Sequence, residues 1–178
     1  MESENNLIET PLRKKYIYKG KILNLRADEV LLPDKNTAKR EIVEHGGGAA
    51  VLAVKDEKVL FVKQFRYAFS KSIYEIPAGK LENGEKPSNT AARELEEECG
   101  YRAKKLIKLC AAYASPGYST EVIHIFKAED IEKTHKHLDK DEFLISEWIE
   151  KDKIKTMIKD GEICDAKTLI ALSYILDL

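Results

Sequence analysis

The segment Arg93–Glu98 carries one guanidinium and four carboxylates within six residues. If this segment is helical, Glu94 and Glu98 lie one turn apart and Glu97 lies on nearly the same side. Like charges at this spacing destabilise a helix by roughly 0.2–0.5 kcal/mol per pair, and Arg93 offers local compensation. Magnesium takes oxygen ligands and usually keeps waters that phosphate oxygens can replace. The spacing therefore indicates a divalent-cation site that could hold a phosphorylated substrate.

The residues around the glutamates predict a helix over 87–99. Pro87 suits a first helical turn, and Gly100 is a typical stop. The preceding loop, residues 77–86, is dense in Gly, Pro and Asn and brings Glu85 to the same helix end. Apolar residues recur at helical spacing as Ala91, Ala92, Leu95 and Cys99. A solvated acidic face is the ordinary alternative for such a helix, so the wider pattern has to decide.

The rest of the chain predicts a mixed β-sheet with helices on both faces. Residues 1–46 read as a β-rich arm, and residues 47–178 as a single domain whose core begins after Gly46-Gly47-Gly48. Period-two or short apolar runs and helical periodicity mark the remaining elements. Strands are expected at 49–54, 59–65, 72–76, 104–114, 120–130 and 142–149, and closing helices at 152–161 and 165–178.

Composition limits the function classes. The chain has 178 residues, 43% of them hydrophobic, and a formal net charge of −1, so no global charge attracts nucleic acid or an anionic membrane. No apolar run reaches the roughly 20 residues of a membrane span or resembles a signal peptide. The three cysteines are widely spaced and predict buried reduced thiols. We expect a cytoplasmic protein without nucleic-acid or membrane partners.

The helix and its loop match a known motif. Gly79 is followed at fixed spacing by Glu85, by Arg93-Glu94-Leu95, by Glu97-Glu98 and by Gly100. This resembles the complete Nudix box, G-x5-E-x7-R-E-U-x-E-E-x-G-U, with Tyr101 in the last, usually aliphatic place. The resemblance implies an α/β fold, the Nudix α/β/α sandwich with a mixed sheet, here with an N-terminal β-rich arm. It also implies hydrolysis of a nucleoside diphosphate linked to another group.

The resemblance further implies a role for each residue of the box. Arg93 would orient the glutamates and Glu85 would support the loop. The cofactor would be Mg²⁺, with Mn²⁺ as the alternative ion. The implied metal ligands are the backbone carbonyl of Ala78 and the side chains of Glu94, Glu97 and Glu98.

Positions outside the box resemble the ADP-ribose pyrophosphatase subgroup. Pro116 stands 15 residues beyond the box, within AAYASPGYSTEV. Arg66 stands where the subgroup directs an arginine at the diphosphate, a suitable role for a planar donor fork. By the same resemblance, the residues that bind or orient the diphosphate and terminal ribose are Ser115, Pro116, Gly117 and Glu121.

Three arm residues resemble the subgroup's adenosine contacts. Arg40 and Glu41 match a pair that reaches the neighbouring subunit of a dimer, and Tyr18 stands where an aromatic ring can stack on adenine. If they serve the site, the arm must swap across a two-fold homodimer.

A general base is expected in the acidic segment HLDKDEFL. Asp139, Asp141 and Glu142 all precede an apolar strand start, and Glu142 is the first choice. Its role would be to accept a proton from the attacking water.

These patterns together predict a Mg²⁺-dependent ADP-ribose pyrophosphatase that releases AMP and ribose 5-phosphate. One alternative is a Nudix hydrolase of ADP-sugars, NADH or dinucleoside polyphosphates. Another is a non-catalytic ADP-ribose sensor, which the complete glutamate set disfavours.

Overall fold

The computed structural model describes residues 7–140 and 142–177, which divide into two compact units. The first unit contains the residues up to Gly46 together with Ser115–Glu121. The second contains Gly47–Ala114 and the residues from Val122 onward. Segment 115–121, which the sequence placed in the 47–178 domain, thus groups with the N-terminal arm.

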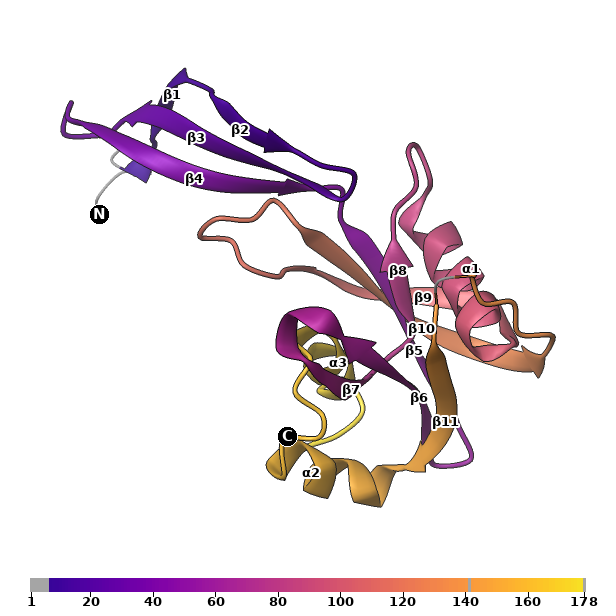
Figure 1. The fold of residues 1–178 in the computed structure, drawn as a ribbon. Coiled ribbons are helices and arrows are strands. Elements are labelled where there is room, and N and C mark those ends of the chain that lie inside the picture. Colours follow the sequence, from indigo (N-terminus) through magenta and orange to yellow (C-terminus); the bar gives the residue numbers. More distant parts are fainter. Residues whose placement is uncertain (1–6, 141, 178) are drawn as a thin grey trace. The chain divides into compact units, whose positions relative to one another are not determined.

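The first unit is an antiparallel β-sheet built around β3 (Figure 1). β4 pairs with β3 along its whole length, while β1 and β2 share the other edge of β3. Segment 115–121 adds an isolated bridge between Ser119 and Val43. The strands are β1 (Thr10–Arg13), β2 (Tyr16–Lys19), β3 (Leu23–Leu31) and β4 (Thr37–His45).

The second unit is a mixed sheet of order β11-β6-β5-β10-β9, to which β7 adds beside β6 and β8 beside β5. β5 and β10 are parallel, and the other neighbours are antiparallel. The strands are β5 (Gly48–Lys55), β6 (Lys58–Arg66), β7 (Lys71–Glu75), β8 (Ala78–Lys80), β9 (Tyr101–Tyr113), β10 (Val122–Lys133) and β11 (Leu144–Glu150). The helices are α1 (Pro87–Cys99), α2 (Lys151–Lys159) and α3 (Ala166–Leu172), and a 3-10 turn, η2 (Tyr67–Phe69), follows β6.

The two faces of this sheet carry separate apolar cores, because alternate residues of a strand point to opposite faces. Ala49 and Val51 of β5 pack with Leu95 of α1. Ala50 and Leu52 pack in the other cluster, which includes residues of α2 and α3. β5 is therefore buried on both faces, and the predicted α/β/α sandwich with a mixed sheet is confirmed.

Several element boundaries differ from the sequence expectation. β8 forms inside the expected loop because it pairs with β5, and β1 forms because an edge of β3 is available. The last helix ends at Leu172 instead of continuing to 178. There Tyr174 N–H donates to Ala171 O and Ile175 N–H donates to Leu172 O, so tighter turns replace the helix.

Of the helices in the described part of the chain, none has the length and apolar character that a membrane span requires. All three cysteines are free thiols, but only Cys99 is buried and Cys164 is exposed, so the expectation of three buried thiols was wrong.

Candidate active site

The ends of α1 are set by local sequence. Lys86 is extended before Pro87, which occupies the first turn. Gly100 adopts a left-handed conformation, with φ +69°, and its N–H donates to the carbonyls of Leu95 and Glu96. The helix therefore occupies the predicted residues, and its glutamates have the predicted spacing.

Two of these glutamates are buried. Glu94 is 7% exposed and Glu98 is 3% exposed, so they belong to the packed side of α1 and not to a solvated acidic face. Glu98 Oε2 accepts a hydrogen bond from Ala78 N–H at 3.0 Å. A Cβ atom on Gly79 would lie 1.8 Å from Glu94 Oε1. Strand β8 thus fixes Glu98 and leaves room for Glu94 only because residue 79 is glycine.

Arg93 holds three glutamates together. Its Nη1 donates to Glu94 Oε1 at 2.7 Å and to Glu97 Oε2 at 2.9 Å. Its Nε and Nη2 donate to the two oxygens of Glu85 at 3.3 and 3.2 Å. Burial alone would lower the pKa of Arg93, but the hydrogen bonds and the charge of the carboxylates raise it above the ordinary value. The guanidinium is therefore a permanent cation that links the helix to the preceding loop.

The buried glutamates hold their protons unusually tightly. Burial raises the pKa of Glu98 to about 8, and the charges of Glu94 and Glu142 act in the same direction. Burial also raises the pKa of Glu94, with Arg93 opposing the shift. The site therefore has a deficit of positive charge when its carboxylates are ionised.

A hard divalent cation fits this donor set. Within residues 7–140 and 142–177, no three Asp, Glu, His or Cys side chains converge as a preformed metal cage. Glu94 and Glu97 are both engaged by Arg93 instead. The buried carboxylate oxygens are nevertheless the ligands that Mg²⁺ prefers, and a cation among them would relieve their repulsion. The ligand set expected from the sequence, which is Glu94, Glu97, Glu98 and the carbonyl of Ala78, stays a prediction.

Glu142 lies within electrostatic reach of the cluster. Its charge raises the pKa values of both Glu94 and Glu98. The loop that leads to it is attached to the end of α1, because His137 N–H donates to Glu97 O at 3.0 Å. Asp139 accepts a hydrogen bond from Glu142 N–H through its backbone carbonyl, and Asp141 lies outside the described residues. Glu142 is therefore electrostatically coupled to the cluster, and its role as the general base stays a prediction.

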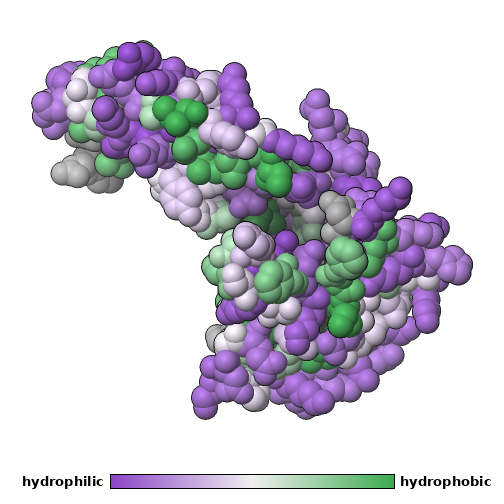
Figure 2. Space-filling view, viewed as in Figure 1, coloured by the Kyte–Doolittle hydropathy of each residue, from purple (hydrophilic) through white to green (hydrophobic). Residues whose placement is uncertain are grey.

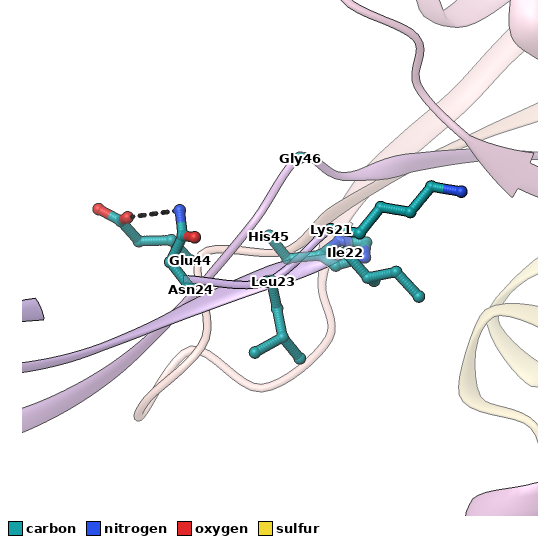
Figure 3. Close-up of a pocket in the computed structure, with 8 residues that line it drawn as sticks. Lys21, Ile22, Leu23, Asn24, Glu44, His45 and Gly46 are labelled. Carbon is teal, nitrogen blue, oxygen red and sulfur yellow. Dashed lines mark hydrogen bonds between the residues drawn. The ribbon is translucent and has the colours of Figure 1, made fainter. Parts of the chain in front are cut away.

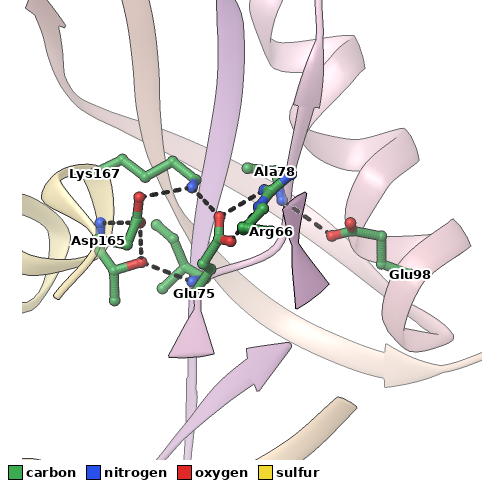
Figure 4. A network of polar contacts seen from close by, with 8 residues as sticks. Arg66, Glu75, Ala78, Glu98, Asp165 and Lys167 are labelled. Atoms are coloured by element: carbon green, nitrogen blue, oxygen red, sulfur yellow. Dashed lines mark hydrogen bonds and ion pairs between the residues drawn. The ribbon is translucent and has the colours of Figure 1, made fainter. Parts of the chain in front are cut away.

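Arg66 enters a second polar network, on the β7 side of the same site (Figure 4). Its Nε donates to Glu75 Oε1 at 2.5 Å and its Nη2 donates to Glu75 Oε2 at 2.7 Å. Lys167 also donates to Glu75 Oε2. The sequence analysis missed Glu75 and Lys167. The signal for Glu75 was a single acidic residue inside the apolar strand run SIYEI.

The remaining predicted residues belong to the first unit. Tyr18 is 58% exposed on β2. Arg40 pairs with Glu9, and Glu41 is exposed beside it on β4. The carbonyl of Ser115 accepts hydrogen bonds from the amides of Tyr118 and Ser119, which closes the turn that contains Pro116 and Gly117. Glu121 lies 3.4 Å from His45 Nδ1. The structure thus groups segment 115–121 with the arm residues inside one unit.

Comparisons with known proteins agree with this geometry. The NUDIX domain model matches residues 36–172, and a model described as the nucleoside diphosphate sugar hydrolase N-terminal domain matches residues 9–43. The chain belongs to the Nudix family.

Similar proteins cover most of this Nudix chain. An ADP-ribose pyrophosphatase of Bacillus subtilis is 47% identical over 96% of this chain and 94% of its own. A methanol dehydrogenase activator of Bacillus methanolicus is 42% identical over 94% and 92%. A GDP-mannose pyrophosphatase of Shigella flexneri is 36% identical over 77% of each chain.

One solved structure shows the same fold. A crystal structure titled as an ADP compounds hydrolase matches with a TM-score of 0.84 and covers 95% of this chain and 93% of its own. Its sequence is only 18% identical. This similarity therefore shows the fold alone and gives no information about the substrate.

A small depression lies in the first unit (Figure 3). It has a volume of about 180 Å³. Asn24 donates a hydrogen bond to Glu44 on its wall, and Lys21 and His45 also line it. Ligand pockets for drug-sized molecules span about 300–1,000 Å³, so this depression is too small to enclose a nucleotide sugar.

Proposed function

We propose that this Nudix enzyme is a Mg²⁺-dependent ADP-ribose pyrophosphatase. The observation that carries the proposal is the Arg93 clamp on Glu85, Glu94 and Glu97 beside buried Glu98. The 47% identity to an ADP-ribose pyrophosphatase over nearly the whole chain supports the choice of substrate. Water would attack a phosphorus atom of the diphosphate, the bridging P–O bond would break, and the products would be AMP and ribose 5-phosphate.

The residues of the site divide this work among them. A divalent cation bound by Glu94, Glu97, Glu98 and the Ala78 carbonyl would supply charge neutralisation and a lowered pKa for water. Glu142 would accept the proton of the attacking water. Arg93 would keep the glutamates in place, and Glu85 would anchor Arg93 to the loop.

Residues outside the Nudix box would recognise the substrate. Arg66 would donate to the diphosphate, and the ribose end would meet Ser115, Pro116, Gly117 and Glu121. Tyr18, Arg40 and Glu41 would contact the adenosine of the partner subunit's site in a domain-swapped homodimer. Three free cysteines favour a reducing compartment, which supports the cytoplasm as the place of action.

The exposed apolar residues of the first unit support the dimer. Val30 is the only hydrophobic residue in its described part that is buried, at 8% exposure. By contrast Ile17, Tyr18 and Ile22 are 55–58% exposed, and apolar side chains are visible on this unit in Figure 2. A sheet with so small a core of its own is expected to bury a face against a partner, and a second copy is the proposed partner.

The function is tested by kinetics over a substrate panel with product identification. The expected result is Mg²⁺-dependent release of AMP and ribose 5-phosphate from ADP-ribose, with a higher kcat/KM than for ADP-glucose, NADH, dinucleoside polyphosphates or GDP-mannose. GDP-mannose belongs in the panel because a relative at 36% identity is a GDP-mannose pyrophosphatase. A higher kcat/KM for any of these competitors would overturn the assignment, as would the absence of Mg²⁺ or Mn²⁺ binding in titration calorimetry with nucleotide present.

A further inference from the structure

Glu75 is the centre of a network of four charged side chains that includes Arg66 (Figure 4). The residue is 2% exposed, and both of its carboxylate oxygens accept hydrogen bonds. Arg66 and Lys167 supply two positive charges, and Asp165, 3.1 Å from Lys167 Nζ, supplies the second negative charge. The buried carboxylate is therefore both paired and neutralised, which burial of a charge requires.

The pairing leaves one edge of the Arg66 guanidinium unused. Glu75 takes the Nε–H and one Nη2–H of the five N–H donors of the guanidinium, which leaves three. Among the described residues, Nη1 has no hydrogen-bond partner, and the Arg66 side chain is 42% exposed. Two parallel hydrogen bonds fix the plane of the fork, so the remaining donors have a defined direction.

Lys167 is placed to secure this arrangement from the C-terminal helix. It binds the same Glu75 oxygen as Arg66 Nη2 and is only 10% exposed. Its ion pairs with Glu75 and Asp165 hold the ammonium group inside the protein, so its charge is directed at Glu75 and is not exposed to solvent. Its neighbour Thr168 accepts a hydrogen bond from Ile76 N–H at 2.9 Å, which attaches α3 to the residue after Glu75.

The segment that contains Glu75 and Ile76 also contacts one of the glutamates proposed to bind the metal. Two residues after Ile76, the Ala78 N–H donates to Glu98. The charge of Glu98 also acts on Arg66, so the two side chains lie within electrostatic range of each other. Residues 75–78 therefore connect α3, the Arg66 guanidinium and the carboxylate of Glu98.

We infer that Lys167 and Glu75 are positioning residues that aim the open edge of the Arg66 guanidinium at the substrate diphosphate. α3 is in this way part of the active site, although Lys167 does not touch substrate. This inference rests on the proposed diphosphate chemistry and adds to it a means of orienting Arg66. A merely structural network would stabilise the fold without any specific effect on diphosphate binding.

The test uses Lys167→Met, Lys167→Arg, Arg66→Gln and the double variant of Lys167→Met with Arg66→Gln. Lys167→Met is expected to raise KM for ADP-ribose about 10-fold, the lower range for loss of an outer partner, with kcat changed less than about threefold. Lys167→Arg should restore most of the affinity. Because Lys167 acts through Arg66, the double variant should be no weaker than Arg66→Gln alone. Lys155→Met, at an exposed position of α2, serves as the matched control and should match the wild type.

Binding of inorganic pyrophosphate, measured by calorimetry with Mg²⁺, separates this inference from the choice of substrate. Lys167→Met should weaken pyrophosphate binding about 10-fold even if ADP-ribose proves a poor substrate. Equal effects of Lys167→Met in the wild-type and Arg66→Gln backgrounds would overturn the inference. So would unchanged pyrophosphate binding by Lys167→Met, or no binding by the wild type. If Lys167→Met does not fold, Glu75→Gln is measured instead and is expected to raise KM in the same way.

Discussion

At the scale of single residues, burial decides what each carboxylate can do. Glu96 lies two residues from Glu94 on the same helix, yet it is partly exposed and its hydrogen bond with Arg102 lowers its pKa. Glu94 and Glu98 are buried, and their pKa values are raised. The glutamates of one helix therefore form both a partly exposed ion pair and a buried cluster suited to a cation.

Replacing Glu98 with Gln should separate stability from activity. In the metal-free fold the pKa of Glu98 is raised from 4.5 to about 8, so the folded state binds the proton more tightly than the unfolded state. Stability is therefore lost as pH rises from about 4.5 to 8. We expect Glu98→Gln to have a shallower dependence of Tm on pH in EDTA, and a higher Tm than the wild type at pH 8.

The same variant should lose turnover by more than about 100-fold, the upper limit for outer partners of a metal site. Thermal melts between pH 5 and 8 and a Mg²⁺-dependent assay provide the two measurements. The difference in Tm between the two proteins should shrink as pH falls from 8 to 5, since Glu98 of the folded wild type then becomes neutral. Near-normal turnover would exclude Glu98 as an essential ligand.

Glu142 should behave as a base and not as a metal ligand. Glu142→Gln is expected to lower kcat by about 10²–10⁴-fold while KM changes little, because proton acceptance contributes only in the transition state. Asp139→Asn is the matched control in the same loop and should keep most of the activity. If Asp139→Asn lost much of its kcat while Glu142→Gln kept a normal kcat, Asp139 and not Glu142 would be the general base.

At the scale of elements, the site depends on how β8 meets α1. Ala78 binds Glu98 through its amide, and Gly79 leaves the space that Glu94 occupies. β8 itself is held by β5, with Ala50 opposite Ala78. The glycine that begins the Nudix box is therefore required by a close approach between strand and helix, and not by an unusual backbone angle.

Gly79→Ala tests this packing. The new Cβ would overlap Glu94 Oε1, which lies at the end of a flexible side chain and can move. We expect activity and Mg²⁺ affinity to fall by about 10–100-fold, while Tm changes by less than about 4 °C. Gly46→Ala is the control, because nothing lies within 4 Å of a Cβ added there. Normal Mg²⁺ affinity in Gly79→Ala would show that the position of Glu94 is not critical.

At the scale of the whole molecule, the two units differ in how much core they contain. The second unit holds two apolar clusters, one on each face of its sheet. The first unit holds a single buried hydrophobic residue in its described part, Val30. Burial of apolar side chains therefore stabilises the second unit by itself, whereas the first unit is expected to gain stability from association with a partner.

Disrupting the exposed face of the arm should dissociate the dimer. The wild type is expected to sediment at twice the chain mass of 20.2 kDa. Ile17→Asp, on β2, should sediment as a monomer with reduced kcat/KM for ADP-ribose, since Arg40 and Glu41 could no longer reach a partner's adenosine. Ile17→Val should remain a dimer. A wild-type protein that is an active monomer at assay concentration would refute the swapped arrangement.

The sequence alone determined the features that depend on neighbours along the chain. Helix α1 has the bounds that Pro87 and Gly100 indicated, and the spacing of Glu94 and Glu98 follows from helical geometry. The box residues were identifiable because their spacing along the chain is fixed and matches the Nudix motif.

Tertiary structure alone decided the features that depend on distant segments. The burial of Glu94 and Glu98 follows from the approach of β8, and the pair of Glu75 and Lys167 joins residues 92 positions apart. The edge strand β1 and the grouping of segment 115–121 with the arm likewise depend on pairing between remote strands. Local patterns contain no information on which remote segment will supply a partner. The network in which Glu75 and Lys167 hold Arg66 was therefore visible only in the folded chain.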